Sequence, residues 1–283
     1  MSVNSVNTNM GAMIALQSLE NTQQQLSATQ KQISTGYRVA DSADDGAAYA
    51  IAQGIRSTVG ALTSANQQLG NAQGLLSTTQ SGLNNISNTM ASMRDVLVKL
   101  SDSSIQGTER TNYEQQYKSM LANVQTFIQD ADYNGKTLIG DLTGSSGAFG
   151  RVAVARNENG STYGVATFSG SAMFGSISFT TTQLSGASTV AALITATGTF
   201  LNQMGRVGNE LNTIGSAIDY VNNQSTYNND KIDALNSGLG SLIDADLAKE
   251  SAQLTALQIR QQLGTQALSM ANQAPQTLLS LFK

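Results

Sequence analysis

A seven-residue repeat of apolar side chains dominates the sequence between residues 55 and 100. One row of the repeat consists of Ile55, Leu62, Leu69, Leu76, Leu83, Met90 and Leu97. A companion row lies three residues further on, at Ala65, Ala72, Thr79, Ile86, Met93 and Leu100. A strict seven-residue repeat places both rows on one stripe of an α-helix and predicts left-handed supercoiling against partner helices. The expected helix has roughly 45 residues and a length of about 65 Å.

The composition allows long helices to run without interruption. The chain has 283 residues and a single proline, Pro275, where average usage of roughly 5% would give about fourteen. Proline breaks helices because it lacks a backbone N–H and clashes with the preceding turn. The length also suffices for a substantial core in one large domain or two small ones.

Two further segments carry the helical spacing of three and four residues. The first is predicted to fold back on the long helix after a break at residues 101–107, and to end at the turn sequence of residues 132–135. Its apolar positions are Tyr113, Tyr117, Met120, Val124, Phe127 and Ala131. The second is predicted to begin near Thr189, with Phe200, Met204, Val207, Leu211, Ile214, Ile218 and Val221.

Residues 140–188 differ in kind, being rich in glycine, serine, threonine and phenylalanine. Val152 and Val154 precede Asn159-Gly160, and Tyr163, Val165 and Thr167 follow it. This alternation of side chains around an Asn-Gly turn is a strong β-hairpin signal. One or two hairpins are expected here. The tripeptide at residues 159–161 also fits a glycan acceptor pattern, although that pattern is frequent by chance. The predicted fold is therefore mainly α, with long helices in a coiled-coil bundle and a small β-hairpin region in mid-chain.

Both ends of the chain have helical apolar stripes and almost no charge. Glu20 is the only charged residue among the first thirty, and Arg260 is the only one between Ser251 and Phe282. A surface helix normally carries charges on its outer face, so these neutral helices are predicted to contact protein on more than one side. The residues predicted to serve self-assembly are Val6, Met10, Met13, Leu16, Leu19, Leu26, Ile33, Leu247, Leu254, Leu257, Leu263, Leu268, Leu278, Leu279 and Phe282.

The composition also excludes several classes of function. Histidine and cysteine are absent, which removes the common zinc sites, the Ser-His-Asp triad and cysteine nucleophiles. The net charge of −4 argues against a nucleic-acid partner. Apolar runs fall short of the ~18 residues of a membrane span, and the N-terminal sequence lacks the pattern of a cleavable signal peptide. No enzymatic activity, catalytic residue, metal or cofactor is predicted, and neither nucleic acid nor membrane is an expected partner.

A cluster of carboxylates follows the first helix. Ser42 or Asp44 is predicted to cap the next helix, with Asp44 and Asp45 close to its positive N-terminal end. The alternative is a metal or acid–base site at Asp41, Asp44 and Asp45. That alternative is disfavoured because the EF-hand spacing and its closing glutamate are missing.

The two ends of the chain resemble bacterial flagellin, the subunit of the flagellar filament. The N-terminal motifs are AMIALQSL at 12–19, TQKQISTGYRV at 29–39 and Ile51-Ala52. The C-terminal motifs are DADLAKES at 244–251, QIRQQLG at 258–264, ANQAPQ at 271–276 and LLSLF at 278–282. The resemblance covers about ninety residues in the family's order, and the helical middle is consistent with it.

The resemblance implies how the parts of the chain are used. Residues 1–42 and 239–283 are expected to pair as helical arms of the filament's inner tube, and residues 43–139 with 189–238 to form the helical bundle of its outer tube. Residues 140–188 would be the β-hairpin region at a reduced insertion point, making this a short flagellin with little or no outer variable domain.

The resemblance also implies function, location and partners. The chain is expected to be exported unfolded through the flagellar secretion channel and to polymerise into the extracellular filament for swimming motility. Its partners would be further copies of itself, the flagellar junction and cap proteins, an export chaperone and the secretion apparatus. The alternative is the hook–filament junction protein, which has similar arms; the ANQAPQ ending favours the filament subunit.

One stretch departs from the family pattern. Flagellins carry an arginine-rich patch for the innate immune receptor, and the matching stretch here is residues 91–99. Arg94 and Asp95 preserve one charge pair, whereas Ser92 stands where the family has arginine. Weakened receptor activation is therefore expected.

Overall fold

The computed structural model describes residues 8–281, with side chains up to residue 273. Its described residues form two compact units, one within Met1–Thr58 and Asp233–Lys283 and the other from Val59 to Ile232. The long helices are α1 (Met10–Thr35), α2 (Gly46–Leu100), α3 (Gly107–Gln129), α7 (Thr199–Ile243) and α8 (Leu247–Leu281). Within the described residues, α-helices thus predominate, as the sequence predicts. These residues include no helix with the length and apolar character needed to span a membrane.

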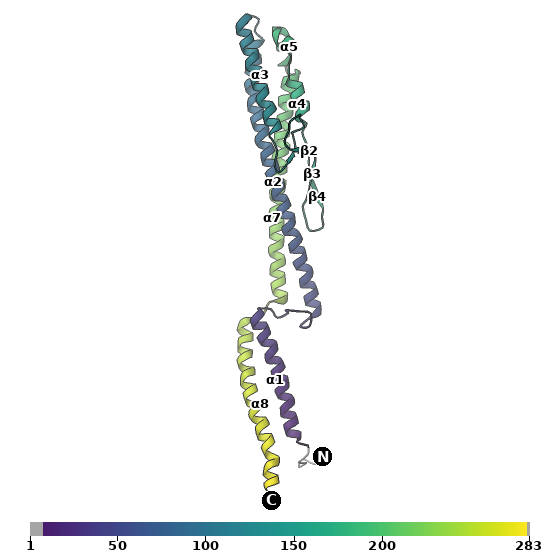
Figure 1. Ribbon diagram of the computed structural model, residues 1–283, viewed down its shortest axis with the longest axis vertical. Helices are drawn as coiled ribbons and strands as arrows, with labels where there is room; N and C mark the ends of the chain where they lie inside the picture. Colours follow the sequence, from purple (N-terminus) through teal and green to yellow (C-terminus); the bar gives the residue numbers. More distant parts are fainter. Residues whose placement is uncertain (1–7, 282–283) are drawn as a thin grey trace. The chain divides into compact units, whose positions relative to one another are not determined.

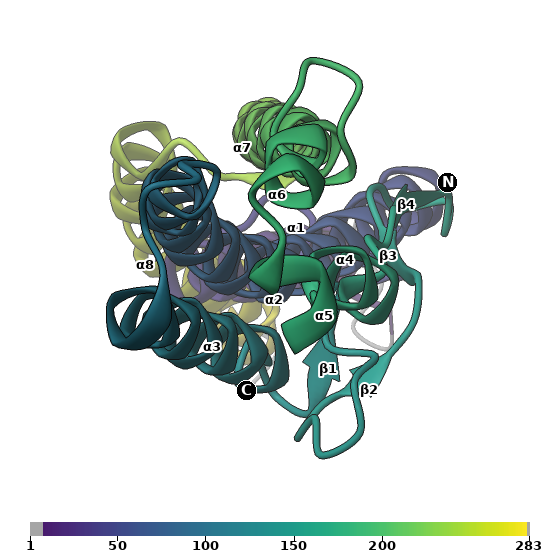
Figure 2. The ribbon, with the colours of Figure 1, turned by 90° about the horizontal axis from the view of Figure 1, so that it is seen from above.

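The predicted heptad rows form the core of the second unit. The companion row from Ala65 to Leu100 is buried throughout, as is the first row from Leu62 to Leu97. Within this unit, α3 and α7 flank α2 in the view along the helices (Figure 2). The core includes Val124 and Ile128 of α3 and Val207 of α7. The predicted association of the long helix with partner helices is confirmed.

A buried arginine organises the reversal between α2 and α3. The Arg110 guanidinium donates hydrogen bonds to the Leu100 carbonyl at 2.9 Å, the Ile105 carbonyl at 3.3 Å and the Leu184 carbonyl at 3.1 Å. Its charge faces Glu114, whose carboxylate is 3.8 Å away on the next helical turn. A buried charge is tolerated only with such partners, so Arg110 fixes the loop onto the bundle.

The mid-chain segment contains the predicted hairpin. Strand β3 (Val152–Ala155) pairs antiparallel with β4 (Thr162–Val165), and Gly160 in the connecting turn has a φ of 72°. A separate parallel pair joins β1 (Lys136–Thr137) to β2 (Ala148–Phe149). The expected hairpin is therefore confirmed.

Helices rather than a second hairpin follow β4. They are α4 (Gly170–Ile177), α5 (Thr181–Ser185) and α6 (Ala187–Leu193). The Ser169 hydroxyl caps α4, and Thr180 with Gln183 forms a reciprocal capping box on α5. The third long helix begins at Thr199 rather than near Thr189, because a turn that ends at Gly198 separates it from α6.

The hairpin is held against α7 by polar and aromatic contacts. Tyr163 of β4 stacks on Tyr220 with ring centroids 4.1 Å apart. Arg156 donates a hydrogen bond to the Tyr220 hydroxyl at 3.3 Å, and Glu158 forms an ion pair with Lys231. The ends of the hairpin turn are therefore attached to α7 by side chains.

Among the polar residues that join α7 to the hairpin, Asn228 of α7 is the most buried. Its side-chain amide donates to the Asn66 side chain at 2.9 Å and to the Arg156 carbonyl at 3.0 Å, and its oxygen accepts from Gln224 at 2.9 Å. Asn228 is fully buried. A satisfied buried asparagine between helices fixes their register, so this residue joins α2, α7 and the hairpin.

Replacing Asn228 should therefore destabilise this unit. Asn228→Ala leaves the Arg156 carbonyl and the Asn66 side chain without their partner, at an expected cost of about 2 kcal/mol. Asn223→Ala, an exposed substitution on the same helix, is the matched control. Urea unfolding of the full chain measures the difference, and equal midpoints for the two variants would contradict the role assigned to Asn228.

Candidate self-assembly surface

Helices α1 and α8, here called the arm pair, run antiparallel and side by side (Figure 1). The Asn9 side chain caps α1 by accepting from the Ala12 N–H, and it also donates to the Ala271 carbonyl at 2.6 Å. Gln261 donates to the Gln23 side chain at 2.6 Å in the middle of the pair. At the other end, Gly36 stops α1 in a left-handed conformation with φ of 74°, which glycine adopts without steric cost.

The two helices bury a narrow seam between them. Leu26 and Thr29 of α1 and Leu257 of α8 are buried, with Leu257 only 2% exposed. Leu254 and Leu268 are half-buried along the same side of α8, as are Leu19 and Ile33 on α1. A Cβ added to Gly264 would lie 3.3 Å from Cδ1 of Leu19, so this glycine permits the close approach of the helices.

Most of the large apolar side chains of the arm pair remain outside the seam. The exposed ones are Met10, Met13, Ile14, Leu16, Leu247, Ile259, Leu263 and Met270. Of the residues predicted for self-assembly, Val6 and Phe282 lie outside the described residues, and Leu278 and Leu279 lie where side chains are not described. Such an extended apolar surface is typical of a protein-binding site.

Sequence patterning missed part of this surface. Ile14 and Ile259 lie outside the predicted apolar stripes and were therefore not predicted to serve self-assembly. Both nevertheless contribute to the exposed apolar surface, and Ile259 is 53% exposed. The signal that could have found them is the neutral outer face of each helix, which already implied contacts beyond a single stripe.

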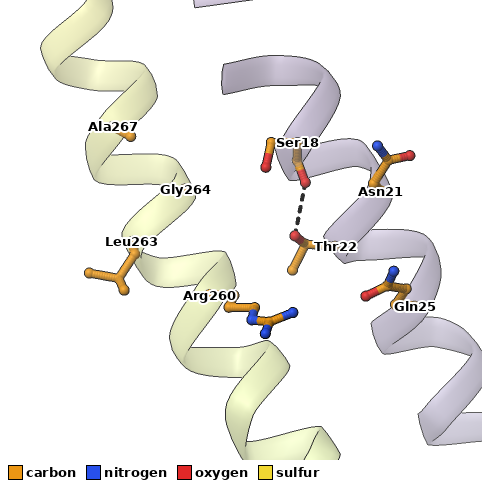
Figure 3. Close-up of a pocket in the computed structure, with 8 residues that line it drawn as sticks. All are labelled: Ser18, Asn21, Thr22, Gln25, Arg260, Leu263, Gly264 and Ala267. Atoms are coloured by element: carbon orange, nitrogen blue, oxygen red, sulfur yellow. Dashed lines mark hydrogen bonds between the residues drawn. The ribbon is translucent and has the colours of Figure 1, made fainter. Parts of the chain in front are cut away.

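An open groove of about 500 Å³ runs along one edge of the arm pair (Figure 3). The Arg260 side chain extends from α8 toward α1 in this groove. The groove is lined by Ser18, Asn21, Thr22, Gln25, Arg260, Leu263, Gly264 and Ala267. Gly264 and Ala267 contribute little side-chain volume to the α8 side of the groove, so the groove is open to solvent.

A lysine orders the loop that follows α1. The Lys31 ammonium contacts the carboxylates of Asp41 at 2.7 Å and Asp44 at 2.8 Å. These hydrogen bonds hold the pKa of both carboxyls below the usual range and raise the pKa of Lys31. An ammonium group, rather than a metal ion, therefore bridges Asp41 and Asp44. No group of metal-ligating side chains occurs among residues 8–273.

The predicted cap of α2 needs correction. Asp45, not Ser42 or Asp44, accepts from the backbone N–H groups of Ala47 at 3.1 Å and Ala48 at 3.0 Å. Asp44 is unavailable for this role because its carboxylate binds Lys31 and the N–H groups of its own loop. The sequence alone does not specify which of two adjacent aspartates turns toward the helix.

Backbone hydrogen bonds hold the loop against the junction between the end of α7 and the start of α8. The Arg38 N–H donates to the Ile243 carbonyl at 2.7 Å, and the Ala245 N–H donates to the Gly36 carbonyl at 2.9 Å. Val39, Ala52 and Ile243 form a small buried cluster beneath them. The end of α1 and the beginning of α8 are thus fixed to each other, which sets the register of the arm pair.

An incompletely covered pair of neutral helices joined to a heptad bundle defines a self-associating helical subunit. Residues 6–143 match the bacterial flagellin N-terminal helical region, and residues 194–282 match the bacterial flagellin C-terminal helical region. The chain belongs to the bacterial flagellin family.

Full-length relatives agree with this assignment. The chain is 31% identical to flagellin FljM of Caulobacter vibrioides, with all of both chains covered. It is 32% identical to a flagellin of Brucella melitensis over 99% of each chain. These relatives are of similar size. A solved structure described as that of a flagellar hook-associated protein from Vibrio parahaemolyticus has a TM-score of 0.57 and 15% identity, covering 71% of this chain and 100% of that one; this likeness concerns the fold alone.

The seam and the outer face of α8 should respond differently to a charge. Leu257→Asp places a carboxylate in the buried seam and should open the arm pair, because an unpaired buried charge is strongly unfavourable. Ile259→Asp, two positions away but exposed, should leave the pair intact. Limited proteolysis of the unpolymerised chain should cut α1 and α8 faster in the Leu257 variant alone. Equal cleavage of both variants would contradict the seam.

Proposed function

We propose that this protein is the structural subunit that polymerises into the bacterial flagellar filament and thereby supports swimming motility. The observation that supports this proposal most directly is the exposed apolar surface of the arm pair, where Met13, Ile14 and Ile259 are not covered by other parts of the chain. Covering such a surface with further copies would provide the hydrophobic free energy for assembly. The role is structural, and no catalytic activity is proposed.

The parts of the chain are assigned as the resemblance implies. Residues 1–42 and 239–283 line the inner tube, and residues 43–139 with 189–238 form the outer tube. Residues 140–188 form the reduced insertion region. This assignment is supported by the matches to the two flagellin regions, which leave residues 144–193 between them.

Export and partners follow from the same proposal. The subunit leaves the cell unfolded through the flagellar secretion channel, assisted by an export chaperone, and adds to the filament beside the junction and cap proteins outside the cell. A seam as narrow as that between α1 and α8 supports this route, since helices in proteins gain most of their stability from tertiary packing. The arm pair therefore has few contacts to break when the chain unfolds for export, and it is completed when further copies cover it.

The hook–filament junction protein remains the second candidate. The structural likeness to a hook-associated protein favours it only at the level of the fold. Full-length similarity to flagellins of Caulobacter vibrioides and Brucella melitensis favours the filament subunit.

We also propose that the chain activates the innate immune receptor for flagellin poorly. Ser92, Arg94 and Asp95 are all exposed on α2, and the Ser92 hydroxyl donates to the Asn88 carbonyl of its own helix at 3.3 Å. A serine cannot supply the charge-assisted hydrogen bonds of an arginine. In a receptor reporter assay, Ser92→Arg should increase signalling by about tenfold, the equivalent of roughly one such bond. Strong signalling by the unsubstituted protein would contradict the proposal.

Polymerisation itself is tested with the exposed face of α8. Purified protein concentrated with salt or filament seeds should form filaments visible by electron microscopy and recoverable by sedimentation. Ile259→Asp should melt like the unsubstituted chain before polymerisation, yet remain in the supernatant, because assembly would bury its carboxylate in every copy. An exposed substitution away from the arms, Asn223→Ala, should sediment normally. Normal filaments from Ile259→Asp would contradict the role of this face.

A further inference from the structure

The middle of the arm pair carries one isolated charge of each sign, one on each helix. Glu20 is the only charged residue from Met10 to Gln30 on α1, and Arg260 is the only one from Ser251 to Gln273 on α8. Neither side chain forms an ion pair or hydrogen bond with another described residue. Two lone charges on otherwise neutral stretches of helix require either solvent or a partner from outside the chain.

The two charges lie on opposite edges of the arm pair. Arg260 lines the groove together with Ser18 and Gln25 of α1. Successive residues of a helix are about 100° apart, so Glu20 is about 160° around α1 from Ser18. A second hollow lies there, lined by Glu20, Gln23, Gln24 and Ser27. One edge is therefore positive and grooved, and the other is negative.

The axial positions of the charges are also close. Gln23 of α1 is hydrogen-bonded to Gln261 of α8, so these two residues lie at the same height along the axis of the antiparallel pair. Glu20 lies three residues from that level and Arg260 one residue beyond it on the other side. At 1.5 Å of rise per residue, the two levels differ by about 6 Å. If two copies lie side by side with their arm pairs parallel, a shift of about one helical turn along the axis brings Glu20 of one copy beside Arg260 of the other.

We infer that the Arg260 groove of one copy receives the Glu20 edge of the next copy, in a contact that rests on the proposed polymerisation. A contact between two different edges is heterologous, and repetition of a heterologous contact that does not close generates a helical filament. A two-fold contact of like edges would instead place Arg260 against Arg260 or Glu20 against Glu20, which electrostatics disfavours. The charges thus select the head-to-tail arrangement.

The groove suits a carboxylate with a polar surround. Asn21 and Gln25 place exposed side-chain amides beside Arg260, and these groups can donate to a carboxylate or bind the glutamines next to Glu20. Leu263, 58% exposed on the groove wall, offers an apolar contact at its rim. The pairing would set register and direction, while the apolar surface supplies most of the association energy.

Charge exchange tests the contact. Glu20→Arg and Arg260→Glu each replace an attraction by a repulsion at every repeat of the contact, and should each raise the critical concentration for polymerisation about tenfold. The Glu20→Arg/Arg260→Glu double variant should return to within about threefold of the unsubstituted protein. An equimolar mixture of the two single variants should also polymerise near the original concentration, because alternating copies again oppose unlike charges. Raising the salt concentration should reduce all these differences.

The controls separate this contact from other effects. Lys249→Glu makes the same charge change as Arg260→Glu at an exposed position of α8 and should polymerise normally. Circular dichroism of each unpolymerised variant should match that of the unsubstituted protein. Unchanged critical concentrations in both single variants, or failure of both the double variant and the mixture to recover, would overturn the contact while leaving polymerisation intact. Failure of the unsubstituted protein to polymerise would overturn the proposed function, and with it this contact.

Discussion

Two helices packed against each other can cover only one stripe of each, and this limit determines how the ends of the chain behave. In the arm pair, Leu26 and Leu257 are covered, whereas Met13 and Ile259 on the outer faces are not. A lone exposed apolar residue is ordinary, but here they recur along both helices in a nearly uncharged surround. The arm pair therefore leaves an extended apolar surface exposed, which is the surface that the proposed assembly would cover.

The unit between Val59 and Ile232 provides the contrast. Its heptad rows are closed by α3, α7 and the short mid-chain helices, so the core is complete within one chain. The buried Tyr117 hydroxyl donates to the Ile177 carbonyl at 2.6 Å, and burial raises the pKa of Tyr117. Asn228 and Arg110 likewise have their partners. One unit thus covers its apolar core within the chain, whereas the other leaves apolar side chains exposed that the proposed assembly would cover.

The sequence predicted those features that depend on local pattern. The heptad rows and the hairpin around Gly160 follow from periodicity and turn chemistry, and both occur in the structure. Features decided by tertiary contacts were not predictable. Asp45 caps α2 because Lys31 engages its neighbour, and residues 170–193 form short helices because their apolar side chains reach the bundle core. The place of Ile259 in the exposed apolar surface was not predictable, because an apolar stripe identifies the side of a helix that is buried but not how far a contact surface extends beyond it.

Hydrogen exchange of the backbone amides in α1 and α8, measured before and after polymerisation, tests the central claim most directly. Amide protection reports local opening of each helix. If assembly completes the arm pair, amides around Leu16 and Ile259 should exchange rapidly in the unpolymerised protein and become strongly protected in filaments, while those of α2 between Leu69 and Leu97 stay protected in both. Equal protection of α1 and α8 in the two states would contradict the account, because the arms would then be complete without other copies.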